Sequence, residues 1–297
     1  MRKIIYLVNP KSGTQKKDDL IELIKSATTE KKIEFVILPT PADGNYIGIK
    51  EKIQQENFTD IVICGGDGTV NQAINALADT KAHFGIIPMG SGNGLALSAG
   101  LSVTAKKALD TIFNGVARYT DAFLVNEQFG CMLCGLGFDA TIAHQFARSS
   151  RRGLTTYATL TTKNFLNSTT WDLEFEVEGK KFHTDAFFVS IANSNQFGNN
   201  ITIAPEAELT DGLLDIVIVK KTVKPVLIMQ VLQQILTGKV KEIEKAMDNS
   251  VAYFQTQNLR IINKQLAPIH IDGEPKEAME DITIKILPNH FKLIFEQ

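Results

Sequence analysis

The sequence predicts an α/β domain followed by an antiparallel, β-sandwich-like domain. Up to about residue 115, short apolar runs alternate with stretches of helical period, whereas later apolar runs are separated mainly by turn residues. The length of 297 residues also exceeds that of a typical single domain. Because 44% of the residues are hydrophobic and 22% are charged, the composition is that of a globular chain with ample core material.

The first part of the chain contains four predicted buried strands separated by amphipathic helices. This repeated order implies a doubly wound parallel sheet with both faces covered. Ligands of such sheets bind outside the carboxyl ends of the strands, so the loops that follow the first, third and fourth strands are the expected site. The predicted strands are 4–8, 34–38, 61–64 and 84–87, and the helical stretches are 20–24, 47–53 and 70–77.

After Asp121 the pattern becomes that of an antiparallel β-rich domain. We therefore expect domains at 1–121 and 122–297, with the last ~10 residues free to return to the first domain. Two helices interrupt the second half, at 143–165 and 226–236, and the latter should pack in the core or in a homodimer. The predicted β runs are 123–137, 173–177, 182–192, 214–219, 258–262, 268–271 and 282–286.

Charge, cysteine content and hydropathy limit the possible partners and location. The 31 basic and 33 acidic residues give a net charge of -2, which argues against nucleic-acid binding. Three cysteines are an odd number and fit a reducing compartment. No run approaches the ~18 apolar residues of a spanning helix. We expect a cytoplasmic protein whose membrane contact is peripheral.

Glycine-rich loops follow three of the predicted strands. Residues 65–69, Gly-Gly-Asp-Gly-Thr, join the third strand to a helix, where free amides and the helix dipole favour phosphate. Alone, this loop would be read as a tight turn with Asp67 as a cap, because such loops are common between strands and helices. Loops 9–13 and 88–94 lie at the same predicted edge, so together they indicate a nucleotide-phosphate site. None matches the P-loop or dinucleotide-binding pattern.

These loops resemble the catalytic domain of the diacylglycerol, sphingosine and ceramide kinase superfamily, particularly its soluble bacterial lipid kinases. The resemblance continues in family order through the second half and spans nearly the whole chain. The matching residues there are Gly135-Leu136-Gly137-Phe138-Asp139-Ala140, Arg152-Gly153 with Tyr157, Ala192-Asn193, Ala204-Pro205 with Ala207, 211–215 and Ile271-Asp272-Gly273-Glu274.

The resemblance implies an ATP-dependent kinase that phosphorylates a lipid hydroxyl, first of all converting diacylglycerol to phosphatidate. It also implies Mg2+ as cofactor and a lipid substrate reached by peripheral contact with the inner face of the membrane. The positions that match nucleotide-binding residues of the family are Asn9, Pro10, Lys11, Ser12, Gly13, Thr40, Gly65, Gly66, Asp67, Gly68, Thr69, Asn71 and Ser91.

Carboxylates provide the candidate base. A hydroxyl nucleophile needs a proton acceptor within hydrogen-bond reach, and a nucleotide needs Mg2+ on oxygen ligands. By pattern alone, Asp272-Gly273-Glu274 reads as an exposed hairpin turn. The resemblance instead implies that Glu274 is the catalytic base and Asp67 a catalytic residue that organises metal or phosphate. Asp67 and Asp272 remain alternative bases, and Asp121 a further carboxylate of the network.

A second, structural Mg2+ site is implied near Asp211. In the sequence, Asp211-Gly212 reads as a turn into the strand 214–219. The resemblance implies that the Asp211 carboxylate and the backbone carbonyls of Glu208 and Leu213 hold the metal.

The identity of the acceptor is open. Gly94 stands where many bacterial diacylglycerol kinases have aspartate, and the 90–94 loop is similar to that of sphingosine and ceramide kinases. A sphingoid base is therefore the second candidate. A kinase of a soluble substrate is an alternative because NAD kinases and phosphofructokinases share the Gly-Gly-Asp-Gly core, and a non-catalytic nucleotide or lipid sensor is another.

Overall fold

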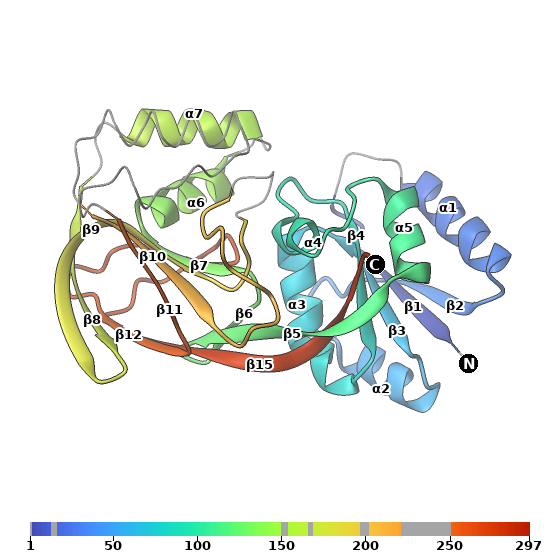
Figure 1. Ribbon diagram of the computed structural model, residues 1–297. Helices are drawn as coiled ribbons and strands as arrows, with labels where there is room; N and C mark the ends of the chain where they lie inside the picture. The colour runs from blue at the N-terminus through green and yellow to red at the C-terminus, as the bar shows by residue number, and fades with distance from the viewer. Residues whose placement is uncertain (1, 13–16, 150–153, 166–168, 197–201, 221–250) are drawn as a thin grey trace. The chain divides into compact units, whose positions relative to one another are not determined.

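The computed structural model describes residues 2–12, 17–149, 154–165, 169–196, 202–220 and 251–297. The chain divides into two compact units (Figure 1). Unit 1 comprises Met1–Thr120 and Asn289–Gln297, and unit 2 comprises Asp121–Pro288. The helix predicted at 226–236 and the predicted site residue Gly13 lie outside the described residues.

Unit 1 is built on a parallel sheet with the strand order β2-β1-β3-β4-β15 (Figure 1). Strand β15 (Asp281–Phe295) joins this sheet at its end, where Lys292 and Leu293 pair in parallel with β4. The other strands run parallel to one another, as predicted. They are β1 (Lys3–Val8), β2 (Glu34–Pro39), β3 (Asp60–Gly65) and β4 (His83–Pro88).

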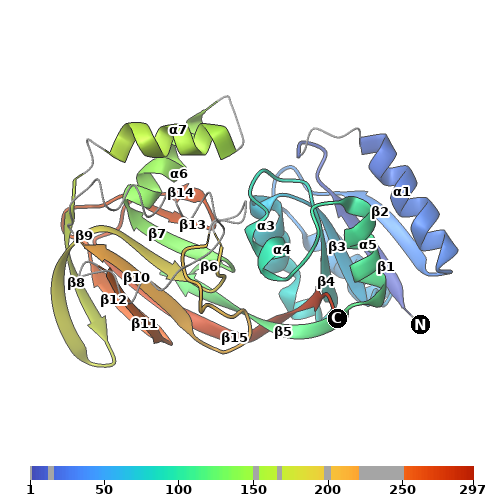
Figure 2. The ribbon, with the colours of Figure 1, turned by 45° about the horizontal axis from the view of Figure 1, so that its top comes forward.

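Helices cover both faces of this sheet (Figures 1 and 2). Alternation along the strands sends Tyr6 and Val62 into one core with Leu20 of α1 and Leu109 of α5. Helix α3 packs on β3 from the other face. The helices are α1 (Lys17–Glu30), α2 (Ile47–Gln55), α3 (Asp67–Leu77), α4 (Gly94–Ser98) and α5 (Ala105–Asn114), with a 3-10 turn at Ala78–Thr80.

Unit 2 is an antiparallel β structure, as the sequence predicts (Figure 2). Its strands follow the order β14-β13-β7-β9-β8-β12-β15, and β10 pairs with β9 and β11. The strands are β5 (Val116–Val125), β6 (Gln128–Gly130), β7 (Leu133–Gly137), β8 (Trp171–Val177), β9 (Lys180–Ala192), β10 (Leu214–Lys220), β11 (Val251–Thr256), β12 (Asn258–Ile262), β13 (Ile269–Ile271) and β14 (Glu274–Lys276).

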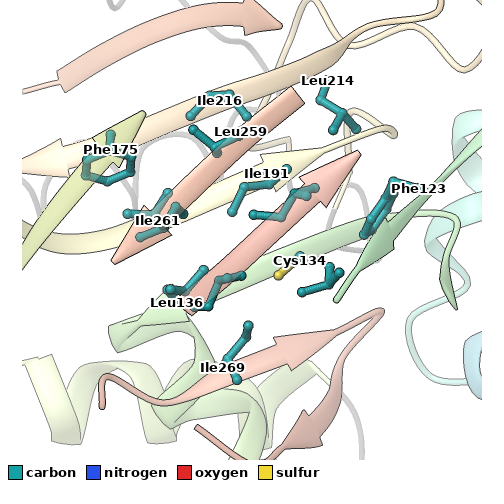
Figure 3. Close-up of a cluster of buried hydrophobic side chains, with 14 of the residues drawn as sticks. Phe123, Cys134, Leu136, Phe175, Ile191, Leu214, Ile216, Leu259, Ile261 and Ile269 are labelled. Carbon is teal, nitrogen blue, oxygen red and sulfur yellow. The ribbon is translucent and has the colours of Figure 1, made fainter. Parts of the chain in front are cut away.

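One apolar layer forms the core of unit 2. Figure 3 shows side chains from several strands pointing into it, among them Phe123, Leu136, Phe175, Ile191 and Ile261. All of these are fully buried. Because most of these strands contribute alternate residues, the layer sets their register.

Two sequence-based predictions for unit 2 are wrong in detail. The single helix predicted at 143–165 is two helices, α6 (Phe138–Arg148) and α7 (Leu154–Phe165). Helix α6 begins earlier because Gly137, at φ 84°, turns the chain directly out of β7. The β run predicted at 123–137 is divided because Asn126 and Glu127 adopt positive φ and form the turn between β5 and β6.

No helix in the described ranges combines the length and the apolar character that crossing a membrane requires.

Candidate functional site

The glycine-rich loops of unit 1 lie together at the carboxyl edge of its sheet. The backbone N–H of Asn9 donates to the Cys64 carbonyl (2.9 Å), and that of Met89 donates to the Gly65 carbonyl (2.8 Å). Each loop therefore leaves its strand while still bonded to the neighbouring one. Thr40, which follows β2, is held in the same way by its N–H on the Val8 carbonyl (3.0 Å).

Two glycines let the loops after β3 and β4 touch. A Cβ placed on Gly90 would lie 2.6 Å from the Cα of Gly66, and a Cβ on Gly66 would lie 2.9 Å from the Cα of Gly90. Separations this short are essentially not tolerated by packed heavy atoms. The contact between the two backbones therefore requires glycine at both positions. It places the backbone N–H groups of the loop after β3 beside those of the loop after β4.

Asp67 connects these two loops with its carboxylate. Its Oδ2 accepts the backbone N–H of Asn93 (2.7 Å) and its Oδ1 accepts that of Gly94 (2.8 Å). Asp67 is also the first residue of α3, where the positive end of the helix dipole favours a negative charge. The structure therefore gives Asp67 a role in holding the 90–94 loop, while its predicted action on metal or phosphate remains a prediction.

Asn93 closes the loop from within. At φ 56° it adopts the left-handed conformation that asparagine tolerates well. Its Oδ1 accepts the N–H of Gly90 (2.8 Å), and its Nδ2 donates to the Gly90 carbonyl (2.8 Å). The bend at Ser91, an exposed residue in the predicted nucleotide-binding set, is fixed by these two bonds.

The loop after β1 joins the same group through Asn9. The Asn9 Nδ2 donates to Oγ1 of Thr69 in the first turn of α3 (2.7 Å), and its Oδ1 accepts the backbone N–H of Lys11 (2.8 Å). Ser12 donates through its backbone N–H to the Asn9 carbonyl (3.4 Å). Among the other predicted nucleotide-binding residues, Gly68 and Asn71 lie on α3 and Pro10 is exposed beside Asn9.

The residues at this edge fit a polyphosphate. Helix α3 presents its N-terminus without a side-chain cap bond, beside the backbone contact between Gly66 and Gly90. Lys17, the first residue of α1, has a buried Nζ with no hydrogen-bond partner among the described residues. Burial lowers the pKa of this amine. A bound phosphate would supply the anionic partner that the Lys17 ammonium lacks among the described residues.

The predicted base lies in a tight turn of unit 2. Strands β13 and β14 form a hairpin in which Ile271 pairs with Glu274. Asp272 (φ 50°) and Gly273 (φ 78°) occupy the two turn positions, the pattern of a type I′ turn. Glu274 is exposed at the first position of β14, where its carboxylate is accessible.

Asp272 has the opposite surroundings. Its carboxylate is buried and accepts three consecutive backbone N–H groups: those of Cys131 (2.9 Å), Met132 (2.9 Å) and Leu133 (3.0 Å). These bonds give Asp272 a structural role. Of the two carboxylates in the turn, Glu274 is the one open to a substrate.

The turn before β10 gathers negative charge. Oδ1 of Asp211 accepts the backbone N–H of Leu213 (2.9 Å), and Oδ2 of Asp121 accepts that of Gly212 (2.7 Å). Burial, followed by the charges of Asp121 and Glu208, raises the pKa of the Asp211 carboxyl. Oxygen donors and negative charge suit Mg2+.

Within the described ranges, no three His, Cys, Asp or Glu side chains come close enough to form a metal site by themselves. The predicted site relies on one side chain, that of Asp211, and on the backbone carbonyls of Glu208 and Leu213. This ligand set remains a prediction.

Comparison with protein families decides where the chain belongs. Residues 3–125 match the diacylglycerol kinase catalytic domain, and residues 133–295 match the YegS C-terminal NAD kinase beta sandwich-like domain. The second match alone covers more than half of the chain. The chain belongs to the diacylglycerol kinase and YegS lipid kinase family.

Relatives and solved structures agree with this assignment. A diacylglycerol kinase of Bacillus subtilis (strain 168) is 25% identical over 279 residues, which cover 92% of this chain and 90% of the relative. A probable lipid kinase YegS-like of Enterobacter sp. (strain 638) is 28% identical over 278 residues, covering 90% and 89%. The crystal structure of a diacylglycerol kinase from Bacillus anthracis str. Sterne shares the fold, with a TM-score of 0.74, 20% identity and coverage of 99% and 97%.

In this lipid kinase, the sequence predicted the loops better than the bonds between them. Asn93 and Lys17 were missed as members of the unit 1 site. Asparagine between two glycines is a recognisable signal for a turn with left-handed backbone, so Asn93 could have been found. The buried amine of Lys17 could not, because its burial depends on the packing of α1 against the sheet.

Proposed function

We propose that this lipid kinase transfers the γ-phosphate of ATP to a lipid hydroxyl, with diacylglycerol as first candidate and phosphatidate as product. The observation that carries the proposal is the backbone contact of Gly66 and Gly90, held by the Asp67 carboxylate at the start of α3. It gathers amide donors from two loops beside the N-terminus of a helix, which is an arrangement suited to phosphate.

Positioning and charge neutralisation account for most of the catalysis in phosphoryl transfer. The amides of loops 65–69 and 90–94 would bind phosphate oxygens, and the Lys17 ammonium would supply a positive charge that is already desolvated. The Asn9–Thr69 bond would keep the loop after β1 against α3 while the nucleotide is bound.

Mg2+ would supply further charge neutralisation on the phosphates. Each carboxylate oxygen has two lone pairs, so Asp67 can accept the amides of Asn93 and Gly94 and still bind a cation. The Asp211 carboxylate and the carbonyls of Glu208 and Leu213 would hold a separate, structural ion.

Glu274 is the proposed general base. Its exposed carboxylate would take the proton of the lipid hydroxyl. The hydroxyl oxygen would then form a bond to the γ-phosphorus, while the bond between the γ-phosphorus and the oxygen that bridges it to the β-phosphate breaks. Asp272 is less suited to this role because three backbone amides already occupy its buried carboxylate. The products are the phosphorylated lipid and ADP.

Diacylglycerol is preferred as acceptor because relatives of nearly full coverage are named diacylglycerol kinases. A sphingoid base is the second candidate because Gly94 replaces the aspartate found in many of these enzymes. Since the lipid resides in a bilayer, we propose peripheral contact with the inner face of the membrane.

The test is an incubation of the purified chain with radiolabelled ATP, Mg2+ and mixed micelles of diacylglycerol or sphingosine, with NAD in a parallel reaction. We expect labelled phosphatidate. Glu274→Gln should lower the rate by ~10²–10⁴ without weakening ATP binding, because only the proton acceptor is lost.

Glu277→Gln is the matched control, since Glu277 is an exposed glutamate shortly after the same hairpin, and it should retain the wild-type rate. Label in NAD alone, or in none of the three acceptors, would refute the proposed function. A fully active Glu274→Gln variant would remove the base role from Glu274.

A further inference from the structure

A buried acid–imidazole pair lies behind the Asp272–Glu274 turn. Nε2 of His270, in the middle of β13, is 2.8 Å from Oδ2 of Asp139, in the first turn of α6. Both side chains are almost completely inaccessible, with 2% of His270 and 6% of Asp139 exposed. Neither residue takes part in the proposed phosphoryl transfer.

The hydrogen bonds of His270 define its tautomer. The backbone N–H of Gly273 donates to Nδ1 of His270 (3.2 Å), so Nδ1 is the acceptor nitrogen. Nε2 therefore carries the proton and donates it to Asp139. The result is a continuous chain of hydrogen bonds from Asp139 through His270 to the backbone of the turn.

The neighbouring strand leaves space for this pair. Gly135 of β7 is paired with His270 of β13, and a Cβ at Gly135 would lie 2.2 Å from Oδ2 of Asp139 and 2.4 Å from Nε2 of His270. Any other residue at 135 would displace the pair. Stability alone is a weak reason for burying such a pair, because desolvation offsets much of the attraction.

Hydrogen bonds therefore fix both central residues of the turn. Asp272 is fixed by the amides of 131–133, and Gly273 is fixed by His270. Glu274 follows immediately, and its backbone direction is set by these two attachments. We infer that His270, which Asp139 orients, is a positioning residue that holds the Glu274 carboxylate in its reactive direction. This inference depends on the proposed function, in which Glu274 is the base.

Two substitutions of His270 separate its two hydrogen bonds. Asparagine places its Oδ1 near the position of Nδ1 and can still accept from Gly273, whereas glutamine reaches the position of Nε2 and can donate only to Asp139. We expect His270→Gln to lower kcat by ~10², the effect of a misplaced reacting group, with an unchanged KM for ATP. His270→Asn should retain kcat within about tenfold of the wild type.

A double mutant tests whether the pair acts through Glu274. In the Glu274→Gln background, His270→Gln should lower the residual rate no further, because the group that it positions is already absent. Asp139→Asn, which keeps an acceptor for Nε2, is the conservative variant and should also retain kcat within about tenfold. Equal losses in His270→Asn and His270→Gln, or a full additional loss in the double mutant, would overturn the inference.

Hydrogen exchange at the Gly273 amide gives a readout that does not require activity. Exchange should be slow in the wild type and His270→Asn and faster in His270→Gln, because only glutamine leaves this amide without its acceptor. Equal exchange in all three proteins would overturn the inference while leaving the proposed function standing. Failure of the wild type to phosphorylate any lipid would refute the proposed function, and the base-positioning role with it, whatever the exchange rates.

Discussion

Asp67 and Asp272 illustrate how partners decide what a carboxylate can do. Both lie in Asp-Gly motifs to which the family resemblance assigns a possible reactive role, yet each accepts two or more backbone amides in the folded chain. The amides bound by Asp272 belong to residues about 140 positions earlier in the sequence. Sequence could name these aspartates, but it could not show these long-range bonds.

Replacing Asp272 with alanine should destabilise unit 2. Three buried N–H groups would lose their acceptor, and each unsatisfied group costs ~1–3 kcal/mol, so a loss of several kcal/mol in unfolding free energy is expected. Urea unfolding measures it. The control is Asp185→Ala, at an exposed position of β9, which should stay within about 0.5 kcal/mol of wild type. A wild-type midpoint for Asp272→Ala would contradict the structural role.

Lys17→Met should stabilise the free protein while weakening ATP binding. The buried amine has no partner among the described residues, and burial lowers its pKa, so its charge disfavours the fold at neutral pH. The destabilisation caused by the charged Lys17 amine should decline as the pH rises through its lowered pKa, because the folded state releases the proton before the unfolded state does. Melting temperatures with and without ATP provide the measurement.

The matched control for Lys17→Met is Lys25→Met, on the exposed side of the same helix α1. It should change neither ATP affinity nor the pH dependence of the melting temperature appreciably. Unaltered ATP affinity in Lys17→Met would show that the amine does not meet the phosphates.

Strand periodicity was sufficient to predict the first four strands of unit 1, because each is a short apolar run bounded by turn residues. It failed where one local pattern fits two structures. Phe138 and Ala140 are as buried as the strand before them, so the apolar pattern did not mark the start of α6, and the helix was predicted to begin at 143 instead of at Phe138. Helix α5 was not predicted, although its apolar residues Ala108, Leu109 and Ile112 follow a helical spacing.

The turn between 208 and 213 should respond to Mg2+. Burial and neighbouring charges raise the pKa of Asp211, which means that its charged form is disfavoured in the folded state. At a pH above the raised pKa, the ionised Asp211 carboxylate lowers the free energy of unfolding. This destabilisation is relieved as the pH falls through the raised pKa, because the folded state binds the proton first. A bound cation relieves the same destabilisation at neutral pH.

We therefore expect Mg2+ to raise the melting temperature at neutral pH and to have less effect as the pH falls toward the carboxyl range. Asp211→Asn should abolish the Mg2+ effect, and Asp110→Asn, at an exposed position of α5, should keep it. The same Mg2+ shift in wild type and Asp211→Asn would place the ion elsewhere.

Domain organisation was predictable in outline because the change from alternating helices and strands to antiparallel strands is visible in the sequence. The path of β15 was harder to predict. This strand begins as an antiparallel partner of β12 in unit 2 and ends as a parallel partner of β4 in unit 1. Alternation describes only the first part of the strand, because the consecutive residues Leu293 and Ile294 are both buried at its end.

The central claim is that the touching glycine loops of unit 1 form a site for the phosphates of ATP. Calorimetric titration of ATP into the full chain, compared between Gly66→Ala and Gly48→Ala, tests it most directly. A Cβ at Gly66 would meet the Gly90 Cα at 2.9 Å, whereas one at Gly48 in α2 has nothing within 4 Å. We predict that Gly66→Ala loses ATP affinity by at least ~10-fold while Gly48→Ala binds as the wild type does. Equal ATP affinity in the two folded variants would contradict the claim.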